Sequence, residues 1–158
     1  MSKTKSRLYI AYGSNLNLGQ MARRCPTAKV VGTAAMKNWR LRFRGSYGGA
    51  VATVERFKGG SVSVLVWELQ PQDEGALDIY EGWPQLYHKK TVRIMLNGKR
   101  VNAMIYIMNK EYPYGRPGAG YFNIIRDGYI SAGFDVNVLY NAAQKSSKKG
   151  GKGYDSLY

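Results

Sequence analysis

The chain has 158 residues with an ordinary apolar fraction of 44%, so it is long enough to bury the core of one domain. It has no apolar run near the roughly 20 residues of a membrane span, and its basic start lacks the apolar segment of a signal peptide. We therefore expect no association with a membrane. A single cysteine cannot form an internal disulfide, which favours a reducing, cytoplasmic setting.

The net charge of +14 is high for this length and favours attraction to polyanions such as nucleic acid. Most of the Lys and Arg residues are scattered, and the sequence shows no helix-turn-helix, zinc-finger or RNA-recognition motif. A concentrated basic block occurs only at residues 145–153 and is typical of a solvated tail. We expect a domain over residues 1–144 and a flexible basic tail over residues 145–158, with nucleic acid as an alternative partner that the motifs do not favour.

The predicted elements are short strands, hairpins and a few helices. Apolar alternation predicts strands at residues 7–12, 28–36, 39–44, 51–55, 61–69, 86–96 and 100–108. Helices are predicted at residues 18–24, 71–81, 122–132 and 135–142. Lys58-Gly59-Gly60 indicates one hairpin turn, and Asn97-Gly98 is the strongest turn signal in the chain. Consecutive hairpins without strand–helix–strand alternation favour an antiparallel sheet or barrel over a doubly wound nucleotide-binding fold.

The turn after the first strand is a candidate binding site. Gly13, Ser14 and Asn15 tolerate unusual backbone angles and carry little side-chain bulk. Such a loop can direct several N–H groups toward an anion or a carbonyl oxygen. Asn17 can cap the short helix that follows and add its positive end to the same place. An ordinary strand–turn–helix corner explains the same residues, so this stretch alone does not decide the function.

Glu81 is the candidate for acid/base chemistry. It ends the helix predicted at residues 71–81, and Gly82-Trp83-Pro84 turns the chain away. A carboxyl flanked by Tyr80 and Trp83 would be partly desolvated, which raises its pKa toward the neutral range that a general acid/base requires. A helix-terminal Glu that merely pairs with Arg or Lys is the alternative.

Other reactive side chains are scarce. His88 is the only histidine and shares a strand with lysines, while Cys25 precedes Pro26 without an obvious activating base. We interpret the histidine as a surface or supporting residue and the cysteine as structural. One His and one Cys cannot assemble a transition-metal site, and no carboxylates show ligand spacing. We therefore expect neither a metal nor a cofactor.

Three ordered blocks together carry a family resemblance. They are Tyr12-Gly13-Ser14-Asn15-Leu16, residues 77–87 (LDIYEGWPQLY) and residues 117–129 (PGAGYFNIIRDGY). In order and spacing they resemble the γ-glutamylcyclotransferase-like family, also called AIG2-like, over roughly residues 7–140. One position departs from the family pattern, because Gly118 stands where the family usually has Ser. Any hydrogen bond or substrate contact of that hydroxyl is absent here.

The resemblance implies both a fold and a reaction. The implied fold is α+β, a small mixed and mostly antiparallel β-barrel with flanking helices, and the strand pattern above suggests about seven strands. The implied reaction cyclises the γ-glutamyl group of a small substrate to 5-oxoproline and releases an amine or amino acid. Glu81 would take the catalytic acid/base position. The implied substrate-binding residues are Tyr12, Gly13, Ser14, Asn15, Leu16, Tyr87 and Tyr121.

This chemistry needs no Ser, Cys or His nucleophile, because the substrate's own α-amino group attacks the γ-carbonyl. Two alternatives stay open at this stage. One is a non-catalytic basic binding module of the same fold. The other is a tailoring enzyme that removes a γ-glutamyl protecting group from a larger amine and differs at the mouth of the pocket, around Trp83 and residues 112–120. The sequence also leaves open the leaving amine and whether the protein is a monomer or a homodimer.

Overall fold

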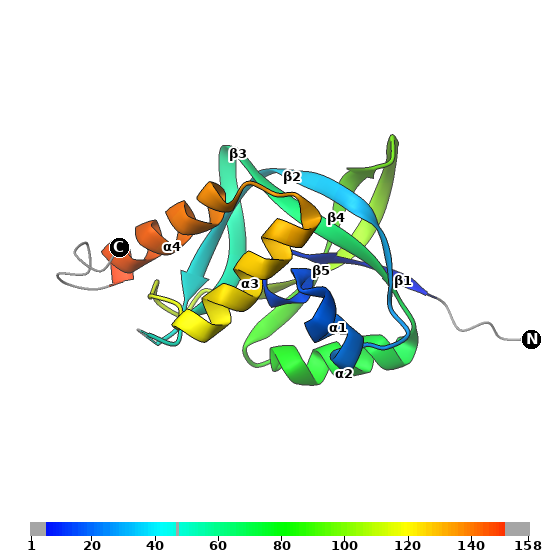
Figure 1. Ribbon diagram of the computed structural model, residues 1–158, viewed down its shortest axis with the longest axis horizontal. Helices are drawn as coiled ribbons and strands as arrows, with labels where there is room; N and C mark the ends of the chain where they lie inside the picture. The colour runs from blue at the N-terminus through cyan, green and yellow to red at the C-terminus, as the bar shows by residue number, and fades with distance from the viewer. Residues whose placement is uncertain (1–5, 47, 151–158) are drawn as a thin grey trace, which may run out of the picture.

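The computed structural model describes residues 6–46 and 48–150. Within these residues the protein has an α+β fold, with one five-stranded sheet and four α-helices (Figure 1). The elements in chain order are β1 (Arg7–Ala11), the 3-10 turn η1 (Ser14–Leu16), α1 (Leu18–Arg24), β2 (Lys29–Arg44), β3 (Val51–Leu69), α2 (Pro71–Glu81), β4 (Tyr87–Leu96), β5 (Lys99–Met108), α3 (Ala119–Ala132) and α4 (Val136–Gly150).

The short strand β1 lies in the middle of the sheet, whose strand order is β2-β3-β1-β5-β4. Tyr9 pairs with Trp67 of β3 in the antiparallel direction and with Met104 of β5 in the parallel direction. Ile10 is completely buried there. Because β1 ends inside the core, the turn that follows it begins in a buried place.

The α+β class is as expected, but the closed barrel and the number of about seven strands are wrong. The sheet has five strands and is open, with β2 and β4 at its edges. Two pairs of predicted strands are each one long, bent strand. Asn38 and Gly59 both have a positive φ, and the Gly59 N–H donates to the Asn38 side-chain oxygen at 3.0 Å. The ladder shifts register between Lys37 and Trp39 and then continues. The glycines at 59–60 therefore bend β3 instead of reversing it.

The hairpin turn between β4 and β5 and both ends of α2 agree with the sequence-based predictions. Asn97 and Gly98 both adopt positive φ and join β4 to β5 in a two-residue hairpin. Helix α2 begins at Pro71, and the backbone N–H of Gln70 donates to Asp73 at 2.8 Å. Gly82 adopts a left-handed conformation and ends the helix directly after Glu81.

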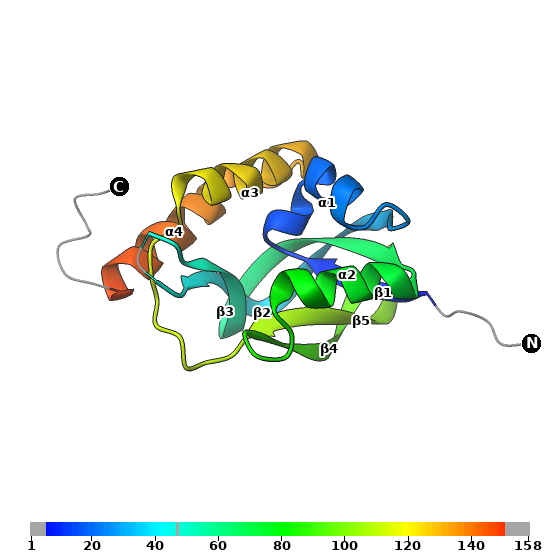
Figure 2. The same ribbon diagram turned by 90° about the horizontal axis from the view of Figure 1, so that it is seen from below.

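Helix α3 packs against η1 through Gly128, where an added Cβ would lie 2.6 Å from the Cβ of Leu16. Figure 2 shows α1 and α3 on one side of the molecule and β4 on the other. In the part of the chain that the structure describes, no helix is long and apolar enough to cross a membrane.

Helix α4 extends past the domain boundary expected at residue 144. Ser146 is buried, and its hydroxyl accepts a hydrogen bond from the Phe43 N–H at 2.9 Å. Ser147 is buried as well. The polar serines in a basic run gave no sign of this packing. The expectation of a flexible tail is therefore wrong for residues 145–147, which belong to the packed part of α4, and the helix itself extends to Gly150. Residues 151–158 of the expected tail lie outside the described residues.

Candidate active site

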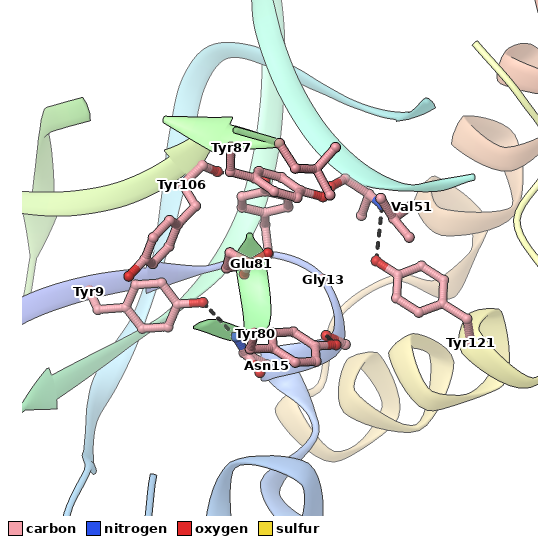
Figure 3. Close-up of a pocket in the computed structure, with 13 residues that line it drawn as sticks. Tyr9, Gly13, Asn15, Val51, Tyr80, Glu81, Tyr87, Tyr106 and Tyr121 are labelled. Atoms are coloured by element: carbon pink, nitrogen blue, oxygen red, sulfur yellow. Dashed lines mark hydrogen bonds between the residues drawn. The ribbon is translucent and has the colours of Figure 1, made fainter. Parts of the chain in front are cut away.

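A cavity of about 250 Å³ lies where the turn after β1, the end of α2 and strands β3, β4 and β5 meet. Figure 3 shows Glu81 near its centre with tyrosine rings around it. Glu81 is the only charged residue among those that line it. The lining residues are Tyr9, Tyr12, Gly13, Ser14, Asn15, Val51, Ala52, Tyr80, Glu81, Leu86, Tyr87, Tyr106 and Tyr121.

The position of Glu81 changes its acidity. Burial raises the pKa of its carboxyl to about 7, and the nearby positive charge of Arg24 opposes this rise. The carboxyl also sits at the C-terminal end of α2, where the helix dipole disfavours a negative charge. No hydrogen bond or ion pair holds the Glu81 carboxyl within the described residues. The group can therefore exchange a proton near neutral pH with a molecule in the cavity.

Trp83 does not line the cavity that holds Glu81, although the sequence suggested that it helps to desolvate the carboxyl. The residue is 41% exposed, and the Lys89 ammonium lies 4.2 Å from its ring. The turn at Gly82 sends this side chain to the surface. Most of the residues that line the cavity with Glu81 come from segments that are distant in the sequence, which a local sequence pattern does not reveal.

The turn after β1 meets Glu81 across the cavity, as the sequence suggested. Ser14 and Asn15 are buried, and their backbone N–H groups donate no hydrogen bond within the described part of the chain. The Ser14 hydroxyl shares a hydrogen bond of 2.7 Å with the Tyr80 hydroxyl. This arrangement leaves backbone donors beside the cavity that a carboxylate or carbonyl oxygen of a ligand can accept.

Leu16 does not line the cavity. Its side chain is completely buried on the α3 side, and its N–H donates to the Gly13 carbonyl at 3.0 Å. The expected contact between Leu16 and a substrate is therefore not supported. Leu16 belongs to the first motif of the family because its side chain packs beneath the turn, against α3.

Tyr12, Tyr87 and Tyr121, which the resemblance implied, all line the cavity. The Tyr87 hydroxyl donates to the Ala52 carbonyl at 2.6 Å, and the Tyr121 hydroxyl accepts from the Ala52 N–H at 2.9 Å. The Tyr12 hydroxyl donates to the Tyr106 carbonyl at 2.7 Å. Burial raises the pKa of all three phenols well above the ordinary value. These side chains are therefore neutral and held rigidly by the backbone.

Sequence reasoning did not assign Tyr9, Tyr80 and Tyr106 of the cavity lining, or the nearby Arg24, to the site. The Asn15 amide donates to the Tyr9 hydroxyl at 2.8 Å, and the Tyr106 hydroxyl donates to Asp78 at 2.5 Å. Tyr80 was noted only as a neighbour of Glu81. Arg24, on α1, stacks on Tyr80 and donates to the side-chain oxygen of Asn15. Strand pairing and helix packing bring these residues together, and no short motif contains them all.

The remaining sequence candidates lie elsewhere. His88 is exposed outside the cavity and shares a hydrogen bond of 2.9 Å with Asn109. Cys25 is buried and donates to the Asp73 carbonyl at 3.5 Å, and burial raises the pKa of its thiol to about 11. An inert structural cysteine fits these facts.

Gly118, where the family usually has Ser, does not line the cavity either. It is the N-cap residue of α3 and makes no side-chain cap. A hydroxyl at this position would accept a hydrogen bond from the first turn of the helix. The departure from the family pattern therefore affects the start of α3 and not a direct contact in the cavity. Residues 112–120 are also absent from the cavity lining.

The family model described as gamma-glutamyl cyclotransferase, AIG2-like, matches residues 9–123. The chain belongs to this family. The match covers the turn, Glu81 and the cavity tyrosines together.

Relatives and solved structures agree with this assignment to the gamma-glutamyl cyclotransferase family. The chain is 30% identical to a human gamma-glutamylcyclotransferase over 77% of its own length and 69% of the relative. It is 32% identical to the gamma-glutamylcyclotransferase of Bos taurus over 92% of its length and 83% of the relative. A solved structure of a gamma-glutamyl cyclotransferase has a TM-score of 0.78 at 26% identity, covering 87% of this chain and 86% of the other. The protein is an enzyme of this family.

Proposed function

We propose that the protein cyclises the γ-glutamyl group of a small γ-glutamyl peptide or amine to 5-oxoproline and releases the amine. The observation that carries the proposal is the Glu81 carboxyl. Its pKa is raised to about 7, and it lines the same tyrosine-rich cavity as the turn Gly13–Asn15. The names of the relatives supply the substrate class.

In the proposed reaction Glu81 first removes a proton from the substrate's α-ammonium group. The freed amine attacks the γ-carbonyl carbon, a new C–N bond closes the five-membered ring, and the carbonyl oxygen becomes negative. The protonated Glu81 then returns the proton to the leaving nitrogen, the C–N bond to that nitrogen breaks, and the carbonyl re-forms. The ring nitrogen gives up its second proton, which Glu81 can accept and pass to the released amine or to water. One carboxyl thus serves as base and then acid, and the products are 5-oxoproline and the free amine.

The remaining task is to orient the substrate. Both reacting groups belong to one molecule, and a well-oriented intramolecular attack is favoured by about 7–11 kcal/mol over the same attack between separate molecules. The cavity has to hold the glutamyl chain in that folded orientation. The cavity lining has no Lys or Arg, so we assign the glutamyl oxygens to the N–H groups of Ser14 and Asn15. Rigid tyrosine rings exclude water around the folded chain.

The test replaces Glu81 by Gln and measures 5-oxoproline released from γ-glutamyl dipeptides and γ-glutamyl amines. We expect the release to fall by about 100-fold or more, because proton transfer by a positioned side chain contributes about 10²–10⁴-fold. Glu74→Gln is the matched control, since Glu74 lies on the same helix but forms ion pairs with Arg7 and Lys89 outside the cavity. Equal activity in the Glu81 variant would remove this carboxyl from the mechanism.

A further inference from the structure

Tyr9 lies on β1, in the middle of the sheet, and its hydroxyl points into the catalytic cavity (Figure 3). The residue is 3% exposed. Strand pairing holds its backbone between β3 and β5, and the ring of Tyr106 packs edge to face against its ring, with 5.9 Å between the two centroids. The Tyr9 hydroxyl is therefore held in place before a ligand enters the cavity.

The hydrogen bonds of the Asn15 side chain show in which direction the Tyr9 hydroxyl donates. A guanidinium group only donates, so the Asn15 atom that faces Arg24 is the side-chain oxygen, and the amide NH₂ group faces Tyr9. This amide donates to the Tyr9 oxygen at 2.8 Å. The proton of the Tyr9 hydroxyl has no acceptor among the described residues, so it is free to point into the cavity.

Three other phenols of the cavity have no proton to offer a ligand. Tyr12, Tyr87 and Tyr106 already donate to a carbonyl or carboxylate oxygen of the protein, and a hydroxyl has only one proton. Tyr121 resembles Tyr9, because its hydroxyl accepts from a backbone N–H and donates to no group in the described part of the chain. Tyr9 and Tyr121 are therefore the phenols to consider as hydrogen-bond donors to a substrate.

The position of Tyr9 relative to Glu81 separates these two phenols. After burial, the negative charge of Glu81 is the largest cause that raises the pKa of the Tyr9 phenol well above its usual range. In the proposed reaction, Glu81 serves two nitrogens that are both bonded to the γ-carbonyl carbon, so the oxygen on that carbon also lies beside this carboxyl. A donor close to Glu81 is suitably placed to bind that oxygen.

We propose that Tyr9 is a further catalytic residue, whose hydroxyl donates a hydrogen bond to the γ-carbonyl oxygen of the substrate as this oxygen becomes negative. The inference rests on the proposed cyclisation and adds a side-chain donor to the N–H groups of the turn. The phenol keeps its proton throughout. The hydrogen bond is stronger in the transition state than in the bound substrate, which lowers the barrier. Asn15 keeps the hydroxyl turned toward the cavity by donating to its oxygen.

The first test replaces Tyr9 by Phe and measures kcat and KM for 5-oxoproline release from a γ-glutamyl dipeptide at several pH values. We expect kcat to fall by about 100-fold, because loss of one oxyanion donor costs about 10²–10³-fold. KM should stay within about twofold, and the pH profile should keep its shape. Tyr129→Phe is the matched control and should keep the wild-type kcat. Tyr129 is buried outside the cavity, and its hydroxyl has no hydrogen-bond partner among the described residues.

A second variant reverses the hydrogen bond without removing the phenol. A carboxylate accepts but cannot donate, so Asn15→Asp keeps the contact with Arg24 and makes Tyr9 donate to residue 15 instead of to the cavity. We expect its kcat to fall about as far as that of Tyr9→Phe, measured at high pH, where Glu81 is ionised despite the added negative charge.

The two changes remove the same donor, so the double variant should be no slower than the slower single variant. Thermal unfolding shows whether each variant is folded. If Tyr9→Phe does not fold, the kcat of Asn15→Asp decides the question.

Four outcomes overturn the inference. A higher KM with unchanged kcat in Tyr9→Phe would assign this phenol to the substrate's α-carboxylate, and a shifted pH profile would assign it to Glu81. Wild-type kinetics would leave it a structural role only. A fall in kcat for Tyr121→Phe, without one for Tyr9→Phe, would assign the carbonyl oxygen to Tyr121. In each case 5-oxoproline release by the wild type and its loss in Glu81→Gln would still support the proposed function, whereas an inactive wild type would overturn that function itself.

Discussion

The guanidinium of Arg24 stacks on the ring of Tyr80, with 3.5 Å between its central carbon and the ring centroid. The same group donates hydrogen bonds to the side chains of Asn15 and Gln20. Arg24 therefore joins helix α1, the turn after β1 and the last turn of α2, where Glu81 lies. It also contributes the positive charge that lowers the Glu81 pKa against the effect of burial.

Replacing Arg24 by Gln is therefore expected to shift the pH dependence of catalysis. Loss of the positive charge raises the pKa of Glu81 further, so less of the carboxyl is ionised near neutral pH. We expect kcat/KM at pH 6.5 to fall severalfold and to recover at higher pH, measured as a full pH profile of 5-oxoproline release. Arg23→Gln, at an exposed neighbouring position, should leave the profile unchanged. A loss of activity that is the same at every pH would contradict the electrostatic role.

The raised pKa of Glu81 also predicts how stability depends on pH. The pKa is about 7 in the folded protein against 4.5 in the unfolded chain, so the folded state retains the proton between these values. The folded protein is most stable, as far as Glu81 is concerned, when this carboxyl is protonated. This contribution to the free energy of unfolding is fully present below about pH 4.5 and is lost as the pH rises toward 7. Relative to Glu81→Gln, the free energy of unfolding of the wild type should fall by about 2–3 kcal/mol across this window. Urea unfolding at several pH values measures the difference, and parallel curves for the two proteins would contradict it.

Tyr121→Phe is expected to destabilise the protein. The Tyr121 hydroxyl accepts a hydrogen bond from the Ala52 N–H, and its removal leaves a buried donor unpaired, which costs about 1–3 kcal/mol. Tyr112→Phe is the matched control, because the Tyr112 hydroxyl makes no hydrogen bond within the described residues. Chemical denaturation compares the two variants, and equal stability would mean that water replaces the lost acceptor.

Gly128→Ala tests the contact between α3 and the turn after β1. An added Cβ would lie 2.6 Å from the Cβ of Leu16, so the helix or the turn must move. We expect a loss of about 1–3 kcal/mol from overpacking and a lower rate of 5-oxoproline release. Gly120→Ala, on the same helix with nothing within 4 Å of the new Cβ, should be neutral or stabilising by up to about 1 kcal/mol. If the Gly128→Ala variant were as stable as the wild type, α3 or the turn could shift to accept the extra methyl group at little cost.

Gly118→Ser tests the interpretation of the departure from the family pattern. Serine can cap α3, whereas alanine cannot, and either Cβ meets the Gly48 carbonyl oxygen at 3.0 Å. The Ser variant should therefore be more stable than the Ala variant by about 1 kcal/mol, with similar KM for γ-glutamyl substrates. A large change in KM in the Ser variant alone would indicate a contact with the substrate after all.

The sequence predicted the elements whose signals are local. Asn97-Gly98 specifies a tight hairpin because few other residue pairs adopt two successive positive φ angles, and Pro71 with Asp73 specifies a helix start. Gly59-Gly60 carries a similar signal but only bends β3. The difference lies in what faces it, since the bend of β2 at Asn38 accepts the Gly59 N–H. A turn signal in one segment does not reveal the bend in its partner.

The sequence alone identified the reactive group, because residues 77–87 contain a single glutamate, Glu81, at the predicted end of a helix. It also identified the small residues of the turn after β1. Packing decided what surrounds them. Burial by tyrosines from β1, β4, β5 and α3 raises the pKa of Glu81, whereas the adjacent Trp83 turns outward. The environment of Glu81 arises from distances between segments that are remote in the chain, and such distances exist only once the sheet and helices have packed.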